Sequence, residues 1–335
     1  MSDCLMSQRG GKYSIGRTIT DDNVIPIHSL FERIWHVSGI DNTLTYPAVD
    51  NQGNICIPQS IHGIEKLSST DGTKIWLNND YTNVRSSVAI DSNNDIYVVY
   101  QSNKSVRKLS GIDGTEIWSN SDFSNAWAVA IDSDDNIYVT YQNTSGGVRK
   151  LSNKDGTEIW HFSNNELYSA IEIDNNNDVI VNQSDKFIRK LSGIDGKEIW
   201  NYSSSETFRD IIVISKQNND VYIIATNVGL QKLSAIDGNL LWTYNGINNY
   251  NTENMVIDNA ENLYIGDNSF NGILVHKISV INYKEYGMIG SLVGLNTAGC
   301  CGMILYKDYI YLIESTNSGA ILNKCYRQNI YKINS

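Results

Sequence analysis

Four short acidic segments contain the side chains best suited to hold a metal ion. They are DSNND (91–95), DSDDN (132–136), DNNND (174–178) and DNAEN (258–262). Mixed Asp and Asn oxygens are typical of Ca²⁺ loops, which also need a glycine at the sixth position and a distant bidentate glutamate. Neither feature is present at the required position. We therefore interpret the segments as Asx-type turns of β-hairpins and expect no metal site.

The other side chains that could do chemistry form no recognisable catalytic group. Five histidines are scattered, and no HExxH, GxSxG, phosphate-binding glycine loop or Ser/His/Asp grouping is present. Five cysteines include one adjacent pair, Cys300 and Cys301, but no CxxC pair or ligand-like spacing. We expect reduced thiols and assign no catalytic residue.

Tryptophans recur along the chain at nearly constant spacing. They stand at Trp35, Trp76, Trp118, Trp160, Trp200 and Trp242, at intervals of 41, 42, 42, 40 and 42 residues. The last five end near-copies of one phrase, namely KLSSTDGTKIW (66–76), KLSGIDGTEIW (108–118), KLSNKDGTEIW (150–160), KLSGIDGKEIW (190–200) and KLSAIDGNLLW (232–242). Five such matches in register establish an internal repeat.

Each repeat has the pattern of four antiparallel strands. The third unit reads AWAVAID (126–132), SDDN (133–136), IYVTY (137–141), VRKLS (148–152) and TEIWHF (157–162). Its runs are short, rich in Val, Ile, Tyr and Thr, and bounded by Asn, Asp and Gly, which indicates hairpins. No segment has an apolar period long enough for a helix. Repeated four-stranded units predict the blades of a β-propeller.

The DG pair of each phrase predicts a tight turn between the third and fourth strands, because glycine adopts positive φ without a steric penalty. The tryptophan four residues later then lies in the outer strand, where it can pack between neighbouring blades. These residues are therefore expected to hold the blades together.

The two ends of the chain predict how the ring closes. A seventh unit contains GMILYKD (302–308), YIYLIES (309–315) and NIYKINS (329–335), and it stops one strand short. Near the other end, FERIWHVS (31–38) is a Trp-bearing strand with no partner before it. Since unpaired sheet edges favour aggregation, this strand should complete the last blade. We predict an all-β, seven-bladed propeller of four-stranded antiparallel blades, closed by the N-terminal strand.

The repeat also sets the predicted domain boundaries. Residues 1–28 are expected to form an arm and residues 29–335 one propeller, with 29–38 as the outer strand of blade 7. The blades should occupy about 43–79, 84–121, 125–163, 167–203, 208–245, 252–288 and 291–335. The sixth unit has lost its tryptophan, near Tyr286.

The repeated phrase resembles the tryptophan-docking motif of PQQ quinoproteins and their non-catalytic relatives, which include the bacterial outer-membrane assembly lipoprotein. That motif runs roughly Ala-x-Asp-x-x-Thr-Gly-x-x-x-Trp, and its glycine matches Gly72, Gly114, Gly156, Gly196 and Gly238. Lysine replaces its alanine, as at Lys108, and serine replaces its aspartate, as at Ser110. The resemblance covers about residues 30–335 and implies the same architecture.

For cofactors, the resemblance draws attention to Cys300 and Cys301, because some PQQ dehydrogenases carry a vicinal disulfide against the quinone. Alignment with AWAVAID places this pair where the innermost strand of blade 7 begins. A PQQ site also needs a set of Ca²⁺ carboxylates and a general-base Asp, and no matching constellation is visible. We therefore expect ordinary buried thiols and neither PQQ nor Ca²⁺.

Charge and hydropathy restrict the partners. The net charge of −11 and the lack of a basic run argue against nucleic acid, whose binding requires Lys and Arg at the phosphates. The first thirty residues contain no apolar signal region, and no stretch reaches the roughly 20 apolar residues of a membrane helix. We expect a soluble, cytoplasmic protein.

Abundant Asn, Ile, Tyr and Lys indicate an AT-rich genome, such as those of amoebal giant viruses, which leaves virion association open.

The repeats differ most where each innermost strand begins. The two aligned positions there read Thr45, Ser86, Trp127, Ser169, Asp210, Glu253 and Cys301, preceded by Leu44, Arg85, Ala126, Tyr168, Arg209, Thr252 and Cys300. Binding residues concentrate at one end of a rigid scaffold. We predict a polar, aromatic mouth lined by Arg85, Trp127, Tyr168, Arg209, Asp210 and Glu253. Unselected variation among exposed loops is the alternative.

The leading functional interpretation is a non-catalytic scaffold that binds a protein or a small ligand through one face or the central channel. One alternative is an enzyme, either a PQQ-dependent dehydrogenase or a metal-dependent propeller of the lactonase type. A second is a structural or particle-associated protein that packs with copies of itself. Propellers have many unrelated functions, so the fold does not decide among these.

Overall fold

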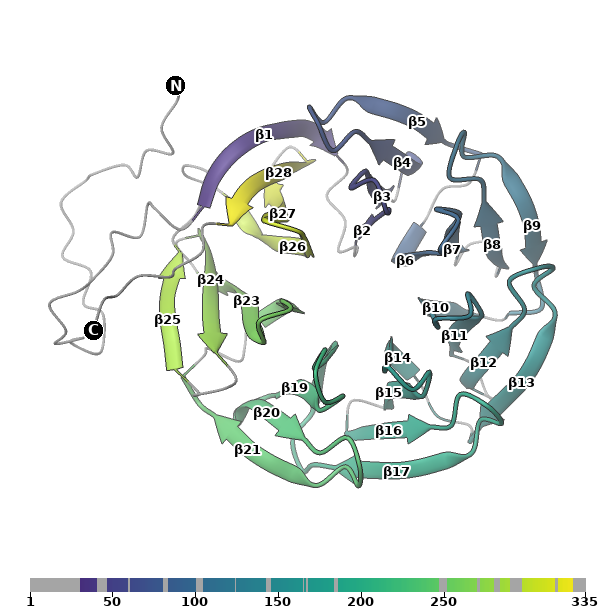
Figure 1. Ribbon diagram of the computed structural model, residues 1–335, viewed down its shortest axis with the longest axis vertical. Coiled ribbons are helices and arrows are strands. Elements are labelled where there is room, and N and C mark those ends of the chain that lie inside the picture. Colours follow the sequence, from purple (N-terminus) through teal and green to yellow (C-terminus); the bar gives the residue numbers. More distant parts are fainter. Residues whose placement is uncertain are drawn as a thin grey trace, which may run out of the picture.

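The protein is a ring of seven four-stranded antiparallel sheets around a central axis (Figure 1). The computed structural model describes residues 31–40, 47–59, 61–80, 84–100, 105–123, 125–142, 146–164, 166, 168–183, 186–246, 252–269, 272–279, 284–289, 297–316 and 319–327. Within these ranges all regular elements are strands, β1 to β28. The seven-bladed, all-β propeller predicted from the sequence is confirmed.

Blades 1 to 4 follow one another along the chain, each from its innermost to its outermost strand. Blade 1 comprises β2 (Ala48–Val49), β3 (Ile55–Gln59), β4 (Gly63–Leu67) and β5 (Lys74–Asn78). Blade 2 comprises β6 (Val84–Ile90), β7 (Ile96–Tyr100), β8 (Ser105–Leu109) and β9 (Glu116–Asn120). Blade 3 comprises β10 (Ala126–Ile131), β11 (Ile137–Tyr141), β12 (Gly147–Leu151) and β13 (Glu158–Ser163). Blade 4 comprises β14 (Tyr168–Ile173), β15 (Val179–Gln183), β16 (Phe187–Leu191) and β17 (Glu198–Ser203).

Blades 5 and 6 continue this order, and blade 7 combines both ends of the described chain. Blade 5 comprises β18 (Phe208–Ile214), β19 (Val221–Ala225), β20 (Gly229–Leu233) and β21 (Leu240–Tyr244). Blade 6 comprises β22 (Thr252–Ile257), β23 (Asn262–Ser269), β24 (Gly272–Ser279) and β25 (Lys284–Ile289). Blade 7 comprises β26 (Thr297–Tyr306), β27 (Tyr309–Thr316), β28 (Gly319–Arg327) and β1 (Phe31–Ile40).

The ring closes through the pairing of β1 with β28. These strands are antiparallel, with Phe31 opposite Arg327 and Ile40 opposite Ala320. Closure by the N-terminal strand is therefore confirmed. The third strand of this blade is β28 and not the predicted segment 329–335, which lies outside the described residues. The position of the third strand was predicted wrongly because β28 (GAILNKCYR) lacks the repeated phrase, and polar residues interrupt its apolar sequence.

Apolar side chains fill the seams between blades. The second strands of blades 1 to 5 are buried at every position, because each lies between two neighbouring sheets and has no face toward solvent. Six clusters of buried apolar side chains join blade 7 to 1, 1 to 2, 2 to 3, 3 to 4, 4 to 5 and 5 to 6. Burial of this surface is the main favourable contribution to the stability of the ring.

Candidate functional site

The tryptophan of each regular blade packs on the glycine turn of the next blade. Gly196 has a φ of 72°. A Cβ atom added there would lie 2.7 Å from Cε3 of Trp160, so glycine is required both for the backbone conformation and for contact with the indole. Trp160 Nε1 also donates a hydrogen bond to the Gly193 carbonyl at 3.1 Å. The predicted structural role of the Trp and DG residues is confirmed.

Four other seams repeat this contact. The indole nitrogens of Trp35, Trp76, Trp118 and Trp200 donate to the carbonyls of Ser69, Gly111, Asn153 and Ala235, at 3.2, 3.3, 3.0 and 3.0 Å. Trp35 comes from β1 and docks on blade 1, so the closing strand carries the same contact across the join. One geometry therefore holds five consecutive seams.

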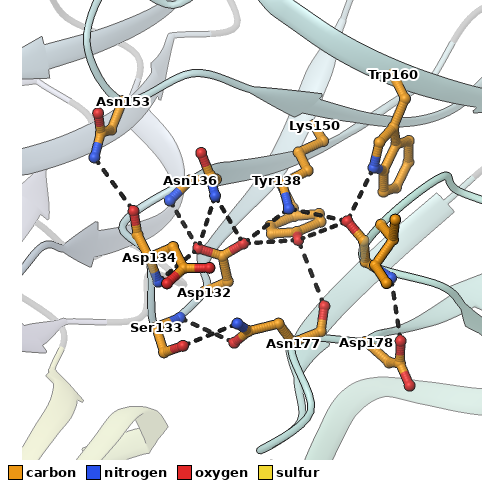
Figure 2. Close-up of polar contacts among 12 residues, drawn as sticks. Asp132, Ser133, Asp134, Asn136, Tyr138, Lys150, Asn153, Trp160, Asn177 and Asp178 are labelled. Carbon is orange, nitrogen blue, oxygen red and sulfur yellow. Dashed lines mark hydrogen bonds and ion pairs between the residues drawn. The ribbon is translucent and has the colours of Figure 1, made fainter.

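A buried lysine beneath the tryptophan links the same two blades (Figure 2). Lys150 Nζ lies 3.0 Å from Asp132 Oδ2 and donates to the Gly193 carbonyl at 2.9 Å. The hydroxyl of Tyr138 donates to the same carboxylate at 2.9 Å. Burial alone would raise the pKa of Asp132, but the bonds from Lys150, Asn136 and Tyr138 outweigh it and hold the pKa below its ordinary value.

The lysine of the phrase forms an ion pair in four other blades. In blades 1, 2 and 4 the partner is the equivalent aspartate, with Lys66 to Asp50 at 2.9 Å, Lys108 to Asp91 at 3.0 Å and Lys190 to Asp174 at 2.7 Å. In blade 5 Ser215 takes that position, and Lys232 pairs instead with Asp220 at 2.8 Å. The lysine of the repeated phrase, which departs from the family motif, thus has a fixed role in this chain. Sequence reasoning missed it because lysine is seldom buried unless it is paired.

The acidic segments are Asx turns, as predicted. Asp132 Oδ1 accepts the backbone N–H of Asp134 and of Asn136, at 3.0 and 2.8 Å. Asp135 of this turn has a φ of 63° and accepts from the Ser92 N–H of blade 2 at 2.9 Å. Comparable bonds between turns run from Asn51 to Asn94, Ser133 to Asn177, Asn175 to Asn219 and Lys216 to Glu261. The turns form a belt across blades 1 to 6 at one end of the ring, and the described ranges contain no group of three or more metal-ligating side chains.

The residues predicted to line a mouth lie at the opposite end of the ring. Six innermost strands, β6, β10, β14, β18, β22 and β26, start at this end, and each begins with a β-bulge. The bulged residues are Arg85 to Ser87, Trp127, Ser169 and Ala170, Arg209 to Ile211, Glu253, Ala298 and Cys301. Five of the six predicted mouth residues are therefore bulge residues, which are left out of the ladder and can be directed away from the sheet.

The side chains of the mouth differ in exposure. Trp127 is half-buried and packs against the cluster between blades 3 and 4. Tyr168 precedes its bulge and is fully buried; its hydroxyl donates to Asn164 Oδ1 at 2.9 Å, and burial raises its pKa. The expectation that Tyr168 lines an open mouth is therefore wrong. It failed because Tyr168 still pairs with Gln183 and packs in the buried cluster between blades 3 and 4.

The charged mouth residues fall on three blades. Arg209 is half-buried and Asp210 is exposed, both at the start of β18. The Asn182 side chain donates to the Arg209 carbonyl at 3.2 Å and so ties this bulge to blade 4. Arg85 and Glu253 occupy the corresponding backbone positions on β6 and β22. The counterparts in blade 1, Leu44 and Thr45, lie outside the described residues.

The described thiols are structural. Cys56 and Cys325 are buried, and burial raises the pKa of Cys56 to about 12. Cys300 pairs with Glu314, and Cys301 is the bulged residue that follows. The adjacent cysteines therefore stand where the alignment placed them, at the start of the innermost strand of blade 7.

Comparison with known proteins agrees with this geometry. A model of the family described as outer membrane protein assembly factor BamB matches residues 59–285. The chain belongs to this family. No curated protein sequence matches it.

Two solved structures show how far the likeness of this BamB-family chain extends. BamB from Moraxella catarrhalis is 12% identical, with a TM-score of 0.59, and the match covers 89% of this chain and 87% of that one. The WD40 β-propeller domain of Doa1 is also 12% identical, with a TM-score of 0.70 and coverage of 90% and 98%. At this identity the two structures support the fold alone. The described part of this chain has no helix long and apolar enough to span a bilayer.

Proposed function

We propose that this protein is a non-catalytic scaffold that binds a partner through the end of the ring where the innermost strands are bulged. The observation that supports this proposal most directly is the coincidence of two features. The bulges fall on the same positions at which the repeats differ in sequence. Away from these positions, blades 1 to 5 share the repeated phrase, as a supporting frame requires.

The composition of this end favours a polar partner with an exposed apolar group. Trp127 offers part of an indole, while Arg209 and Asp210 offer opposite charges on the same bulge. Aromatic residues and arginine are enriched in the energetic centres of interfaces between proteins. We therefore propose a protein partner, with Arg85 and Glu253 extending the contact surface around the axis. The buried Tyr168 supports the bulge of blade 4 and has no contact role.

A pair of matched charge reversals tests the proposal. Asp210 lies at the bulged end, and Asp134 lies in an exposed turn at the opposite end. Both variants, Asp210→Lys and Asp134→Lys, should fold with an unchanged melting temperature, because neither side chain is buried. Partners isolated from the source organism with the wild-type chain would be identified by mass spectrometry and purified, and their Kd measured with each variant.

We expect Asp210→Lys and Trp127→Ala each to weaken binding at least tenfold, and Asp134→Lys to leave it unchanged. The proposal is wrong if Asp134→Lys weakens binding as much as Asp210→Lys does. It is equally wrong if the purified partner binds all three variants with wild-type affinity.

A further inference from the structure

The protein contains a cavity of about 330 Å³ at the seam where the ring closes. Its walls are the outer strand β1 of blade 7 on one side and β3, β4 and β5 of blade 1 on the other (Figure 1). Sites for small ligands have volumes of about 300–1,000 Å³, so this cavity is at the lower end of that range. It has room for one small group, such as a single side chain of a partner.

Two departures from the repeat coincide with this cavity. In blades 2, 3 and 4 the third strand carries an arginine opposite a valine of the second strand, namely Arg107, Arg149 and Arg189. Blade 1 carries the shorter Glu65 at this register, opposite Ile57. The facing strand β1 is irregular between Ser38 and Ile40, and a Cβ added at Gly39 would meet none of the described atoms within 4 Å. Glu65 and Gly39 both line the cavity.

A regular seam shows what this position can hold. Arg149 of blade 3 donates from Nη1 to the carbonyl of Asp122, just beyond the outer strand of blade 2, at 3.2 Å. Asp122 follows Trp118 by four residues, as Gly39 follows Trp35. The cavity beside Gly39 therefore corresponds to the place that a guanidinium group occupies in the seam between blades 2 and 3.

The charges at the cavity are reversed relative to the regular seam. In blade 3 the cation stands on the third strand, and Arg149 Nε lies 3.3 Å from Glu158 Oε2 on the fourth. In blade 1 the third strand carries the anion: Glu65 Oε1 lies 2.9 Å from Lys74 Nζ, and Glu65 Oε2 accepts from Gln59 Nε2 at 2.7 Å. The Glu65 side chain is only 10% exposed and the Lys74 side chain 53%. The carboxylate is thus fixed in the wall, whereas the ammonium can move into solvent.

A guanidinium group matches this site. An ionised carboxylate offers about four acceptor positions and binds guanidinium through two parallel hydrogen bonds. The aliphatic stem of an arginine would contact Val37 and Leu67, which also line the cavity. The net charge of −11 favours the approach of a cation. An anion would instead be repelled by the Glu65 carboxylate, because a buried charge is weakly screened.

We propose that the cavity between β1 and blade 1 binds a guanidinium group, which pairs with the Glu65 carboxylate and displaces the Lys74 ammonium into solvent. The group comes either from a free guanidinium compound or from an arginine side chain of a partner. The site lies at the closing seam and shares no residue with the predicted mouth, so it does not depend on the function proposed above.

Titration calorimetry with the full chain tests the site. The probes are L-arginine, a blocked Gly-Arg-Gly tripeptide, and the same tripeptide with citrulline as the uncharged analogue. At least one arginine probe should bind, and the citrulline peptide should not. Tighter binding of the tripeptide would indicate an arginine of a partner, and tighter binding of L-arginine a free compound.

Two matched variants test the role of the carboxylate. Glu65→Gln should weaken the binding of arginine at least about tenfold, because the buried charge is lost. Glu116→Gln removes the carboxylate of the corresponding pair in blade 2, where Arg107 already fills the seam, and should leave binding unchanged.

The lysine gives the opposite expectation. Lys74→Gln removes the competing ammonium, so we expect guanidinium binding to strengthen about threefold, as for the loss of an exposed ion pair. Unchanged or weaker binding by Lys74→Gln would overturn the proposal, because the ammonium would then not be displaced.

A double variant separates binding from folding. Glu65→Arg with Lys74→Glu recreates the ion pair of blades 2 to 4, so a guanidinium of the chain itself fills the cavity. We expect a melting temperature at or above that of the wild type and no binding of arginine. The proposal is overturned if the double variant melts below the wild type or still binds arginine. It is equally overturned if neither arginine probe binds at about 10 mM, if Glu65→Gln binds like the wild type, or if the citrulline peptide binds as tightly as the arginine peptide.

Discussion

The seam between blades 3 and 4 and the seam between blades 6 and 7 are built differently. At the first, Trp160 docks on a glycine turn, Lys150 crosses to a carbonyl, and Ser133 donates to Asn177 (Figure 2). At the second, the residue in the tryptophan register is Gly287, which lies opposite Lys277 just as Trp160 lies opposite Lys150. The tryptophan lost from the sixth unit is therefore replaced by Gly287, one residue after Tyr286.

The topology of closure explains this difference. In blades 1 to 5 the third and fourth strands are consecutive, so a DG turn joins them and receives the indole of the preceding blade. In blade 7 these strands are β28 and β1, which come from opposite ends of the chain, so no such turn exists. The belt of turns also changes at blade 7. In blades 2 to 6 the turn residue with positive φ is Asn, Asp or Glu, whose oxygen accepts a hydrogen bond from the preceding turn. In blade 7 this residue is Lys307, whose side chain can only donate. Closing a ring with both termini thus removes the docking site from one seam.

Removal of a docking indole should give the largest effect. We expect Trp160→Ala to lower the free energy of unfolding by about 3–5 kcal/mol, because the buried ring leaves a cavity and the Gly193 carbonyl loses a donor. Urea unfolding followed by circular dichroism measures the change. A loss below about 1 kcal/mol, within the range of surface substitutions and small core changes, would contradict a docking role.

Removal of the buried cation should cost nearly as much. Lys150→Met keeps the aliphatic stem but leaves the Asp132 carboxylate buried without its ion-pair partner, at a cost of about 3 kcal/mol. The double variant Lys150→Met with Asp132→Asn should recover part of this loss, since no buried charge then remains. Equal stability of the single and double variants would show that the ion pair is not the source of the effect.

Substitution of two glycines by alanine distinguishes the cost of backbone strain from the cost of disturbed packing. Gly196 and Gly39 have φ angles of 72° and 84°. A Cβ added at Gly196 would meet the Trp160 indole, whereas a Cβ added at Gly39 would meet none of the described atoms within 4 Å. Gly39→Ala should therefore cost about 1 kcal/mol from the backbone alone. Gly196→Ala should cost about 2–3 kcal/mol, because the Trp160 ring must also shift. Identical losses in thermal unfolding would exclude the packing contribution.

Acid should weaken the regular seams. The folded-state pKa of Asp50 and Asp132 is depressed, so the unfolded chain binds more protons as the pH falls. The stabilisation that these ionised aspartates contribute is complete above the ordinary aspartate pKa of about 4. It is lost as the pH falls through their lower folded-state pKa values. Unfolding free energies at pH 7, 5 and 3 would show the drop between the last two. The variant Lys150→Met should show a smaller drop than the wild type.

The smallest effect is expected at the seam without a docking turn. Gly287→Trp restores the tryptophan of the repeat, but the strands of blade 7 offer no turn to receive it. Without a docking contact, we expect the free energy of unfolding to change by less than about 0.5 kcal/mol. A gain comparable to the loss in Trp160→Ala would refute the topological explanation.

Most of the fold could be predicted from the sequence because its signals are local and repeated. The DG turns and the Asx turns each depend on a few adjacent residues, and the tryptophans repeat at a nearly constant interval. The structure confirms all three features. The strand β28 was misplaced because blade 7 lacks the phrase that marks the other blades. Tyr168 was placed in the mouth because sequence alignment does not show which side of a bulge faces the core.

The sequence by itself determined the number of blades, the composition of each blade and the strand that closes the ring, since hydrophobic alternation and turn residues specify hairpins without reference to distant segments. Only the tertiary structure decided which groups meet across the blades. The bond from Lys150 to the Gly193 carbonyl and the bond from the Ser133 N–H to Asn177 form only when neighbouring sheets converge on one axis. That convergence depends on sheet packing, and no local pattern encodes it.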